Sequence, residues 1–190
     1  MSVSGRIPTR EEAWGLLCEW TSTPGLRGHA LAVEAAMREY AEHFGEDSDI
    51  WGVIGLLHDF DYERYPSEDD HPFRGADELR RQGVDEEIVR TIMSHADYSG
   101  IPRETVLMKT LFAVDELCGL VVATALVQPD RKLEQVTVSS IKKKMKRKDF
   151  ARSVNRDDIL KGAEELGVAL DEHIDRVLHA LQRAAPALGL

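Results

Sequence analysis

Four residues whose side chains commonly bind divalent metal ions stand out along the 190-residue chain. They are His29, the adjacent pair His58-Asp59, and Asp115. Asp115 lies within an apolar segment, residues 111–117, where an unpaired carboxylate would be costly to bury. A divalent ion surrounded by imidazoles and carboxylates would remove that cost. The alternative is that Asp115 forms a buried ion pair with Lys109 or Arg103.

Helices are the elements that must bring these residues together. Thr9 followed by Glu12 forms a capping box for a first helix that extends to residue 20, and Pro24-Gly25 breaks it. A second helix, from about residue 28 to 44, carries His29 near its start and apolar residues at spacings of three and four. Asp49 is the predicted cap of a third helix over 50–59, which is apolar almost all round and therefore central. This third helix ends in His58-Asp59.

The rest of the chain has the pattern of further helices joined by short loops. Residues 61–72 contain two prolines and many acids, which predicts a loop over the surface. Beyond it we expect six helices, at about 73–82, 85–96, 103–127, 139–148, 157–166 and 171–185. No β-alternation longer than a few residues and no internal repeat is present. We therefore predict an all-α fold, a single-domain helical bundle over 1–190, with a metal-binding core at 26–127 and a C-terminal helical extension at 128–190.

The order of these residues resembles that of the HD superfamily of metal-dependent phosphohydrolases. The resemblance rests on a histidine, then Gly55-Leu56-Leu57-His58-Asp59, then Ala113-Val114-Asp115-Glu116-Leu117, and it covers about half of the chain. It implies a helical bundle of the HD-domain type. It also implies metal ligation by the corresponding residues, which are His29, His58, Asp59 and Asp115.

Two further histidines are similar to residues of the HD-GYP branch of that superfamily. His71 begins a His-Pro-x-x-Gly segment whose histidine joins a second metal in that branch, and His95 stands where the branch also supplies a histidine. The chain departs from the branch at Ala96, where a second adjacent histidine would stand, and it lacks the Gly-Tyr-Pro signature, which argues against a cyclic-dinucleotide substrate. The resemblance implies one or two divalent ions (Mn, Mg, Fe, Co, Ni or Zn), with His71 and His95 as further ligands and Asp59 as the bridge. The alternative is that these two histidines contact a substrate phosphate or cap helices.

A bound divalent ion would supply the chemistry of phosphoryl hydrolysis. Such an ion lowers the pKa of its water from about 16 toward about 7, so that a hydroxide is available to attack phosphorus at neutral pH. Asp59 would take part in catalysis by holding the ion, and Asp61 and Glu63, just beyond it, are the nearest candidates for proton transfer. We therefore predict an enzyme that hydrolyses a small, nucleotide-like phosphomonoester or phosphodiester.

Two other functions use the same residues. HD proteins that hold two irons catalyse oxidative cleavage, so a di-iron oxygenase is the second enzymatic interpretation. A sensor module that binds metal and phosphate without turnover is the non-enzymatic interpretation.

The block Lys-Lys-Lys-Met-Lys-Arg-Lys at residues 142–148 is the one basic block of the sequence. Its usual interpretation is a solvated helix face. Its functional interpretation is contact with a substrate phosphate, for which Lys142, Lys143 and Lys146 are the candidates because they share a face at helical spacing. The remaining histidines lie among surface-type residues and are interpreted as structural or solvated; they are His43, His173 and His179.

Composition restricts the partners and the location. The formal net charge of -10 argues against binding to bulk nucleic acid, while a bound cation would still admit a small anion. The chain has two cysteines in apolar patterns, and its longest apolar run, residues 118–127, is too short to span a membrane. We expect a cytoplasmic protein, a monomer or homodimer, that binds no membrane and whose partner is a small phosphorylated molecule.

Overall fold

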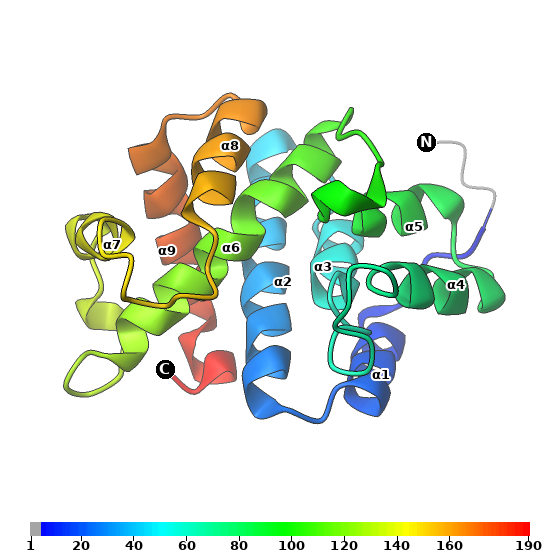
Figure 1. Cartoon of the computed structure of the whole chain (residues 1–190), viewed down its shortest axis with the longest axis horizontal. Coiled ribbons are helices and arrows are strands. Elements are labelled where there is room, and N and C mark those ends of the chain that lie inside the picture. The colour runs from blue at the N-terminus through cyan, green and yellow to red at the C-terminus, as the bar shows by residue number, and fades with distance from the viewer. Residues whose placement is uncertain (1–4) are drawn as a thin grey trace.

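In this computed structural model the described residues, 5–190, form nine α-helices and two short 3-10 helices (Figure 1). Within that range no residue belongs to a β-strand, and an isolated bridge joins Arg6 to Val84. The prediction of an all-α fold is confirmed. None of the described helices is long and apolar enough to cross a membrane.

The helices follow one another with short connections. In chain order they are α1 (Arg10–Trp20), α2 (Pro24–Phe44), α3 (Ser48–Leu57), α4 (Phe73–Arg81), α5 (Glu86–Met93), η1 (Asp97–Ser99), α6 (Val106–Leu126), η2 (Leu133–Gln135), α7 (Val138–Met145), α8 (Arg156–Leu166) and α9 (Leu170–Leu188). Each of the predicted helices is present, and the 3-10 helices η1 and η2 were not predicted.

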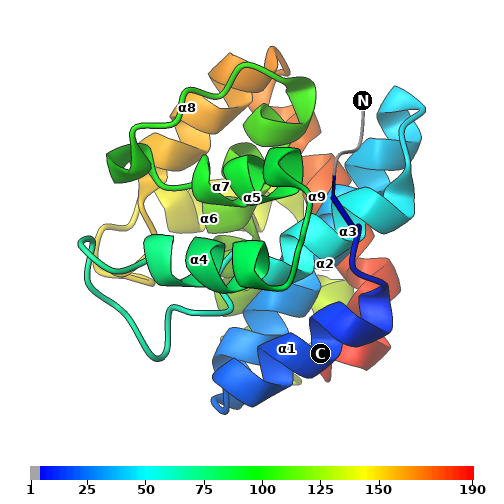
Figure 2. The same ribbon diagram turned by 90° about the vertical axis from the view of Figure 1, so that its right-hand side faces the viewer.

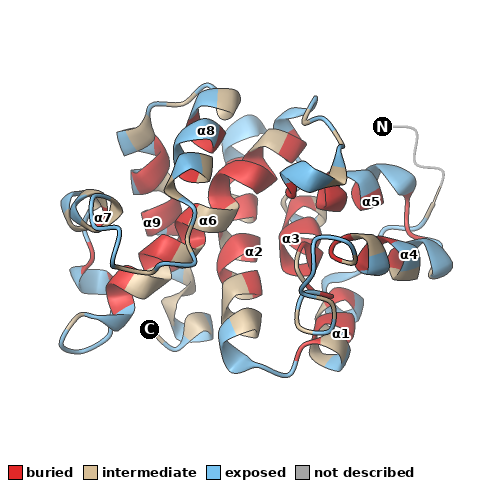
Figure 3. Cartoon of the chain, viewed as in Figure 1, coloured by how far each residue is buried: buried red, intermediate tan, exposed pale blue. Residues whose placement is uncertain are grey.

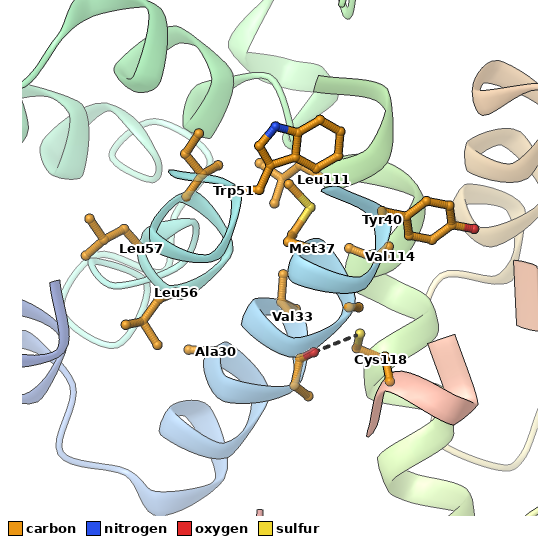
Figure 4. Packing of buried hydrophobic residues seen from close by; sticks show 14 of the residues in the cluster. Ala30, Val33, Met37, Tyr40, Trp51, Leu56, Leu57, Leu111, Val114 and Cys118 are labelled. Atoms are coloured by element: carbon orange, nitrogen blue, oxygen red, sulfur yellow. Dashed lines mark hydrogen bonds between the residues drawn. The ribbon is translucent and has the colours of Figure 1, made fainter. Parts of the chain in front are cut away.

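The core lies where α2, α3 and α6 meet. Every residue of α3 from 51 to 57 is buried, so the prediction that this helix is central is confirmed. Helix α2 packs against α3 on one side and against α6 and α9 on the other, and Figure 3 shows the buried residues concentrated on these helices. In Figure 4, Val33 and Met37 of α2 lie between α3 and the side chains of Leu111 and Val114 in α6. Each such aliphatic side chain contributes about 1.5–3 kcal/mol when fully buried, which makes this helix trio a firm support.

Local signals explain most of the helix ends. The capping box of α1 forms as predicted, with the Thr9 hydroxyl accepting from the Glu12 N–H at 3.2 Å and the Glu12 carboxylate accepting from the Thr9 N–H at 2.8 Å. Three predicted starts were wrong. Helix α6 begins at Val106 rather than at residue 103, because the Thr105 side chain caps it. Helix α2 begins at Pro24. The first N–H groups of a helix have no partner inside it, so a proline, which lacks an N–H, fits its first turn. Asp47 rather than Asp49 caps α3, since its carboxylate accepts from the N–H groups two and three residues ahead.

Helices α4 and α5 cover one side of the bundle, which Figure 2 turns toward the viewer. They pack against each other, and α5 also packs against α3 and α6. The loop at 58–72 leads from the buried end of α3 to the start of α4. This connection matters for the site because it carries Asp59 and His71 back over the core.

Of the two interpretations of His173, structural or solvated, the structural one is confirmed, although the residue does not lie at the surface as its neighbours in the sequence suggested. It is fully buried in α9, where its Nδ1 lies 2.6 Å from the Tyr40 hydroxyl and its Nε2 lies 2.8 Å from the Ala113 carbonyl oxygen. The carbonyl requires an N–H at Nε2, so Nδ1 accepts from the tyrosine. Burial lowers the pKa of His173 to about 4, and the residue is a neutral structural link between α2, α6 and α9.

Candidate metal centre

The structure brings together all six residues for which the sequence predicts metal ligation. His29 comes from α2, His58 and Asp59 from the turn that follows α3, which ends at Leu57 rather than at the predicted residue 59, His71 from the turn before α4, His95 from the turn after α5, and Asp115 from α6. Asp59 lies at the centre of the cluster. Its Oδ2 is 3.5 Å from His58 Nε2, and its Oδ1 is 3.2 Å from the Nε2 atoms of both His71 and His95.

One side of the cluster consists of His29, His58, Asp59 and Asp115. The Oδ1 atom of Asp115 lies 2.9 Å from His29 Nε2 and 3.5 Å from His58 Nε2. Ligand atoms of His29, His58 and Asp59 all lie within 4.8 Å of one another. The alternative of an ion pair between Asp115 and a basic residue is wrong, because Asp115 contacts these histidines and Arg103 binds Asp97 and Glu165.

The other side of the cluster consists of Asp59, His71 and His95. The Nε2 atoms of the two histidines are 3.2 Å apart, and each is 3.2 Å from Asp59 Oδ1, so the three atoms form an equilateral triangle. Two ligands that each lie about 2.1 Å from one ion, at right or tetrahedral angles, are about 3.0–3.4 Å apart. The spacing of these three atoms fits ligands of one shared cation.

Hydrogen bonds at Nδ1 determine which ring nitrogen faces the centre. His58 Nδ1 donates to the Gly55 carbonyl at 2.8 Å, His95 Nδ1 donates to the Ile92 carbonyl at 2.6 Å, and His71 Nδ1 donates to the carboxylate of Asp61 at 2.7 Å. Because those oxygens only accept, each Nδ1 carries the hydrogen and the lone pair of a neutral ring is on Nε2. His58 Nε2 is buried and has no hydrogen-bond partner. Metal-binding histidines are held in this way, and the residues present therefore fit a divalent ion.

The electrostatics of the cluster favour a positive charge at its centre. Burial opposes the protonation of His58, but the carboxylates of Asp59 and Asp115 outweigh it and raise its pKa to about 9. The pKa of His71 is likewise raised to about 9, against the effect of burial, by its bonds to Asp59 and Asp61. The histidines in turn hold the pKa of Asp59 and of Asp115 well below the usual range, although burial alone would raise it. A bound cation would meet the same demand for positive charge.

Five of the six residues line a pocket of about 540 Å³, and the sixth, His58, is fully buried and does not line it. Its lining residues are His29, Asp59, Tyr62, Glu68, His71, His95, Ala96, Asp97, Tyr98, Phe112, Asp115, Glu116, Gly119, Ser153, Val154, Asn155 and Asp158. Six of them are carboxylates, and none of these described residues is lysine or arginine. A phosphate group entering this pocket therefore needs its charge to be balanced by a bound cation.

The structure revises the expected proton-transfer role of Asp61 and Glu63, because neither side chain lines the pocket. Asp61 is buried, and besides holding His71 it accepts from the Gly75 N–H at 2.7 Å. It therefore orients a candidate ligand. Glu63 accepts from the hydroxyl and N–H of Ser22 and from the N–H of Thr23, and these bonds lower its pKa to about 2. It fastens the connection between α1 and α2.

The three candidate lysines lie apart from the metal pocket. Lys142, Lys143 and Lys146 line a separate pocket of about 380 Å³ with Asp171, and Lys142 pairs with that carboxylate at 2.6 Å. Lys146 also lines a further pocket, of about 570 Å³, that adjoins the metal pocket. None of the three is among the lining residues of the metal pocket. Their expected contact with a phosphate at the metal centre is revised for that reason.

Sequence reasoning missed several residues of the pocket. Glu116 accepts a hydrogen bond from the Asn155 N–H at 3.1 Å, and burial together with the charge of Asp115 raises its pKa to about 7. Its place next to Asp115 was an available signal. Tyr62 and Tyr98 add exposed aromatic rings. Nothing in the sequence indicated that Asn155 would meet the centre, because it comes from the distant start of α8.

Comparison with known proteins yields one family. The model of the HD domain matches residues 26–139, more than half of the chain. No curated protein and no solved structure matches it. The matched range extends past residue 127 and contains all six residues of the cluster.

HD domains bind divalent metals and make up a superfamily of metal-dependent hydrolases, some of whose members are non-catalytic. The match is to the domain in general, so the similarity to the HD-GYP branch stays a prediction. The helical fold, the cluster of histidines and aspartates, and the matched range agree with one another. This chain belongs to the HD-domain family.

Proposed function

We propose that this chain is a metal-dependent phosphohydrolase that acts on a small, nucleotide-like phosphomonoester or phosphodiester. The observation that supports it most is the set of three histidines anchored through Nδ1, whose Nε2 atoms converge around Asp59. The pocket volume of about 540 Å³ suits a small molecule.

A divalent ion would supply a hydroxide nucleophile and balance the charge of the phosphoryl oxygens. The residues that would hold it are His29, His58, Asp59 and Asp115. A second ion would be held by Asp59, His71 and His95. The chain's own contribution is to hold these ligands. Asp59 faces both sides of the cluster with different oxygens, which lets one carboxylate serve two groups of ligands. The rigid α2–α3–α6 core supports them, so little rearrangement is needed on binding.

Aromatic residues of the pocket support a substrate with a planar group. Tyr62 and Tyr98 are exposed and line the pocket, and the ring of Tyr62 stands edge-on to His71 with centroids 5.3 Å apart. Flat rings such as nucleobases stack on aromatic faces. Phe112 is less available, because the Arg103 guanidinium lies 3.7 Å from its ring centroid.

The test is phosphate release from a panel of nucleotides and simple phosphate esters by protein loaded with Mn, Mg, Co or Ni. We expect turnover with at least one ion and its loss in Asp59→Ala, while Asp70→Ala, a change in an exposed part of the following loop, remains active. Circular dichroism would verify that both variants are folded. Oxygen consumption by the iron-loaded protein without phosphate release would favour the oxygenase interpretation instead. Phosphate binding without turnover under any of these ions would favour the sensor interpretation.

A further inference from the structure

A second pocket, of about 570 Å³, adjoins the metal pocket and has the opposite charge. Four of its lining residues are cations, Lys146, Lys148, Arg152 and Arg156, against one carboxylate, Asp157. The stretch 153–155 lines both pockets. The two pockets therefore meet across this stretch of chain. We call the second one the basic pocket.

The basic pocket is built on the loop between α7 and α8, which crosses α6 in Figure 1. Val154 packs against α6 next to Gly119. A Cβ added to that glycine would lie 3.5 Å from a methyl carbon of Val154, which is ordinary van der Waals contact. The guanidinium of Arg156 donates to the carbonyl oxygens of Phe150, Ala151 and Val154, with the bonds to Ala151 and Val154 at 2.6 and 2.5 Å. These bonds fix the shape of the loop, so the basic pocket is a formed feature of the fold.

The positive charge of the basic pocket is largely uncompensated. Two of the nearby cations have partners, since Lys142 pairs with Asp171 and Arg147 pairs with Asp149. In contrast, no ion pair within residues 5–190 involves any of the four cations of the basic pocket. The Arg156 guanidinium is held by the carbonyl oxygens of the loop, so the charges left for a ligand are those of Lys146, Lys148 and Arg152.

Uncompensated cations that line one pocket favour an anionic ligand. The neighbouring metal pocket is lined by six carboxylates and is suited to a phosphate only through its bound cation. The two adjoining pockets can therefore each bind an anionic group, the metal pocket through its cation and the basic pocket through lysine and arginine side chains.

We propose that the substrate carries two separated phosphate groups, one of which reacts at the metal centre while the other binds in the basic pocket. This inference rests on the proposed function and narrows its substrate class to small molecules with a phosphate at each end. Lys148 and Arg152 are the specificity residues, because both are exposed cations of the basic pocket and neither lines the metal pocket.

The test is calorimetric binding of chain-matched ligands to Mn-loaded protein. Butane-1,4-diyl, hexane-1,6-diyl and octane-1,8-diyl bisphosphates would each be compared with the alkyl monophosphate of the same length. We expect at least one bisphosphate to bind about tenfold more tightly than its monophosphate, since each exposed charge contact is worth a factor of a few. The double variant Lys148→Gln/Arg152→Gln should lose this preference and bind the monophosphates as the wild type does.

The matched control is Lys132→Gln/Lys143→Gln, which removes the same charge outside the basic pocket and should keep the preference. An equal affinity for both ligand types in the wild type would overturn the inference, as would an equal loss in the two double variants. Binding of tripolyphosphate to EDTA-treated protein separates this inference from the proposed function. If that binding is present and requires Lys148 and Arg152, the basic pocket stands even when no ester is hydrolysed. If esters are hydrolysed and tripolyphosphate does not bind, the proposed function stands and the basic pocket does not.

Discussion

Replacing Asp61 by asparagine is expected to weaken metal binding while leaving the fold in place. The Asp61 carboxylate accepts two N–H groups, from His71 Nδ1 at 2.7 Å and from the Gly75 backbone at 2.7 Å. An amide has one oxygen and one NH2 group, so in Asp61→Asn one of the two N–H groups must face another donor. If the NH2 group faces His71, the ring is driven to carry its hydrogen on Nε2, where it no longer offers a lone pair to a metal.

The magnitude follows from that mismatch. A buried donor left without an acceptor costs about 1–3 kcal/mol, which corresponds to a factor of about 5–150 in an equilibrium constant. Loss of the group that orients a metal-bound histidine typically costs about 10- to 100-fold in affinity. We therefore expect affinity at the Asp59–His71–His95 side to fall by about 10- to 100-fold, with the His29–His58–Asp59–Asp115 side less affected.

The assay is competition between the metal-free protein and a chromophoric chelator for Mn or Zn. Asp70→Asn is the matched control, because Asp70 lies in the same loop and binds Arg74 and Ser67 rather than a candidate ligand. Thermal unfolding would verify that both variants are folded. Wild-type affinity and stoichiometry in Asp61→Asn would refute the reasoning that Asp61 orients a ligand.

Three further predictions address the stability and the selectivity of the protein. Burial lowers the pKa of His173 to about 4, whereas an unfolded histidine titrates near 6.5, so between these pH values the unfolded chain binds one more proton than the folded chain. The wild type should therefore lose about 3 kcal/mol of stability as the pH falls through that window, and His173→Gln should not show this loss. Equal pH slopes of the two proteins in denaturant unfolding would contradict the prediction. Gly162→Ala places a Cβ 2.6 Å from the Ala113 Cα and should lower the free energy of unfolding by about 1–3 kcal/mol. Gly15→Ala, in the middle of α1 and with nothing within 4 Å of the added Cβ, should raise it by about 0.5–1 kcal/mol. Urea unfolding that ranks the two variants in the reverse order would count against the α6–α8 contact. Lys143→Ala should leave KM for a phosphomonoester within about twofold, because its pocket is separate from the metal pocket, and a large rise in KM would restore it to the substrate site.

The clustering of His29, His58, Asp59 and Asp115 could be predicted because they lie in or directly after helices with strong apolar patterns, whereas His71 and His95 lie in turns and were indicated by the family resemblance alone. Burial of α3 on all sides places His58 and Asp59 at the core, and Asp115 stands out as a carboxylate in an apolar stretch. The roles of Asp61 and Glu63 could not be predicted, because closeness in sequence to the ligands does not fix where their side chains point. Their partners, the Gly75 N–H and the N–H groups at 22–23, are brought to them by the turns of the loop.

Helix ends and buried polar residues also differ in how far they could be predicted, because the first depend on local sequence and the second on contacts between distant residues. The start of α5 directly after its N-cap Asp85 and the end of α8 directly before its C-cap Gly167 depend on neighbouring residues and agree with the predicted bounds. The burial of His173 was not predicted, because its neighbours in the sequence are surface-type residues. Its burial depends on a hydroxyl from α2 and a carbonyl from α6, which the folded chain supplies from more than fifty residues away.

The central claim is that His29, His58, Asp59, His71, His95 and Asp115 form a metal centre. Elemental analysis of protein purified without chelator, before and after incubation with Mn, Fe or Zn and desalting, tests it most directly. The account predicts one or two divalent ions per chain in the wild type and their loss in Asp59→Ala. A folded wild-type protein that retains no metal after this treatment, or an Asp59→Ala variant with wild-type metal content, would contradict it.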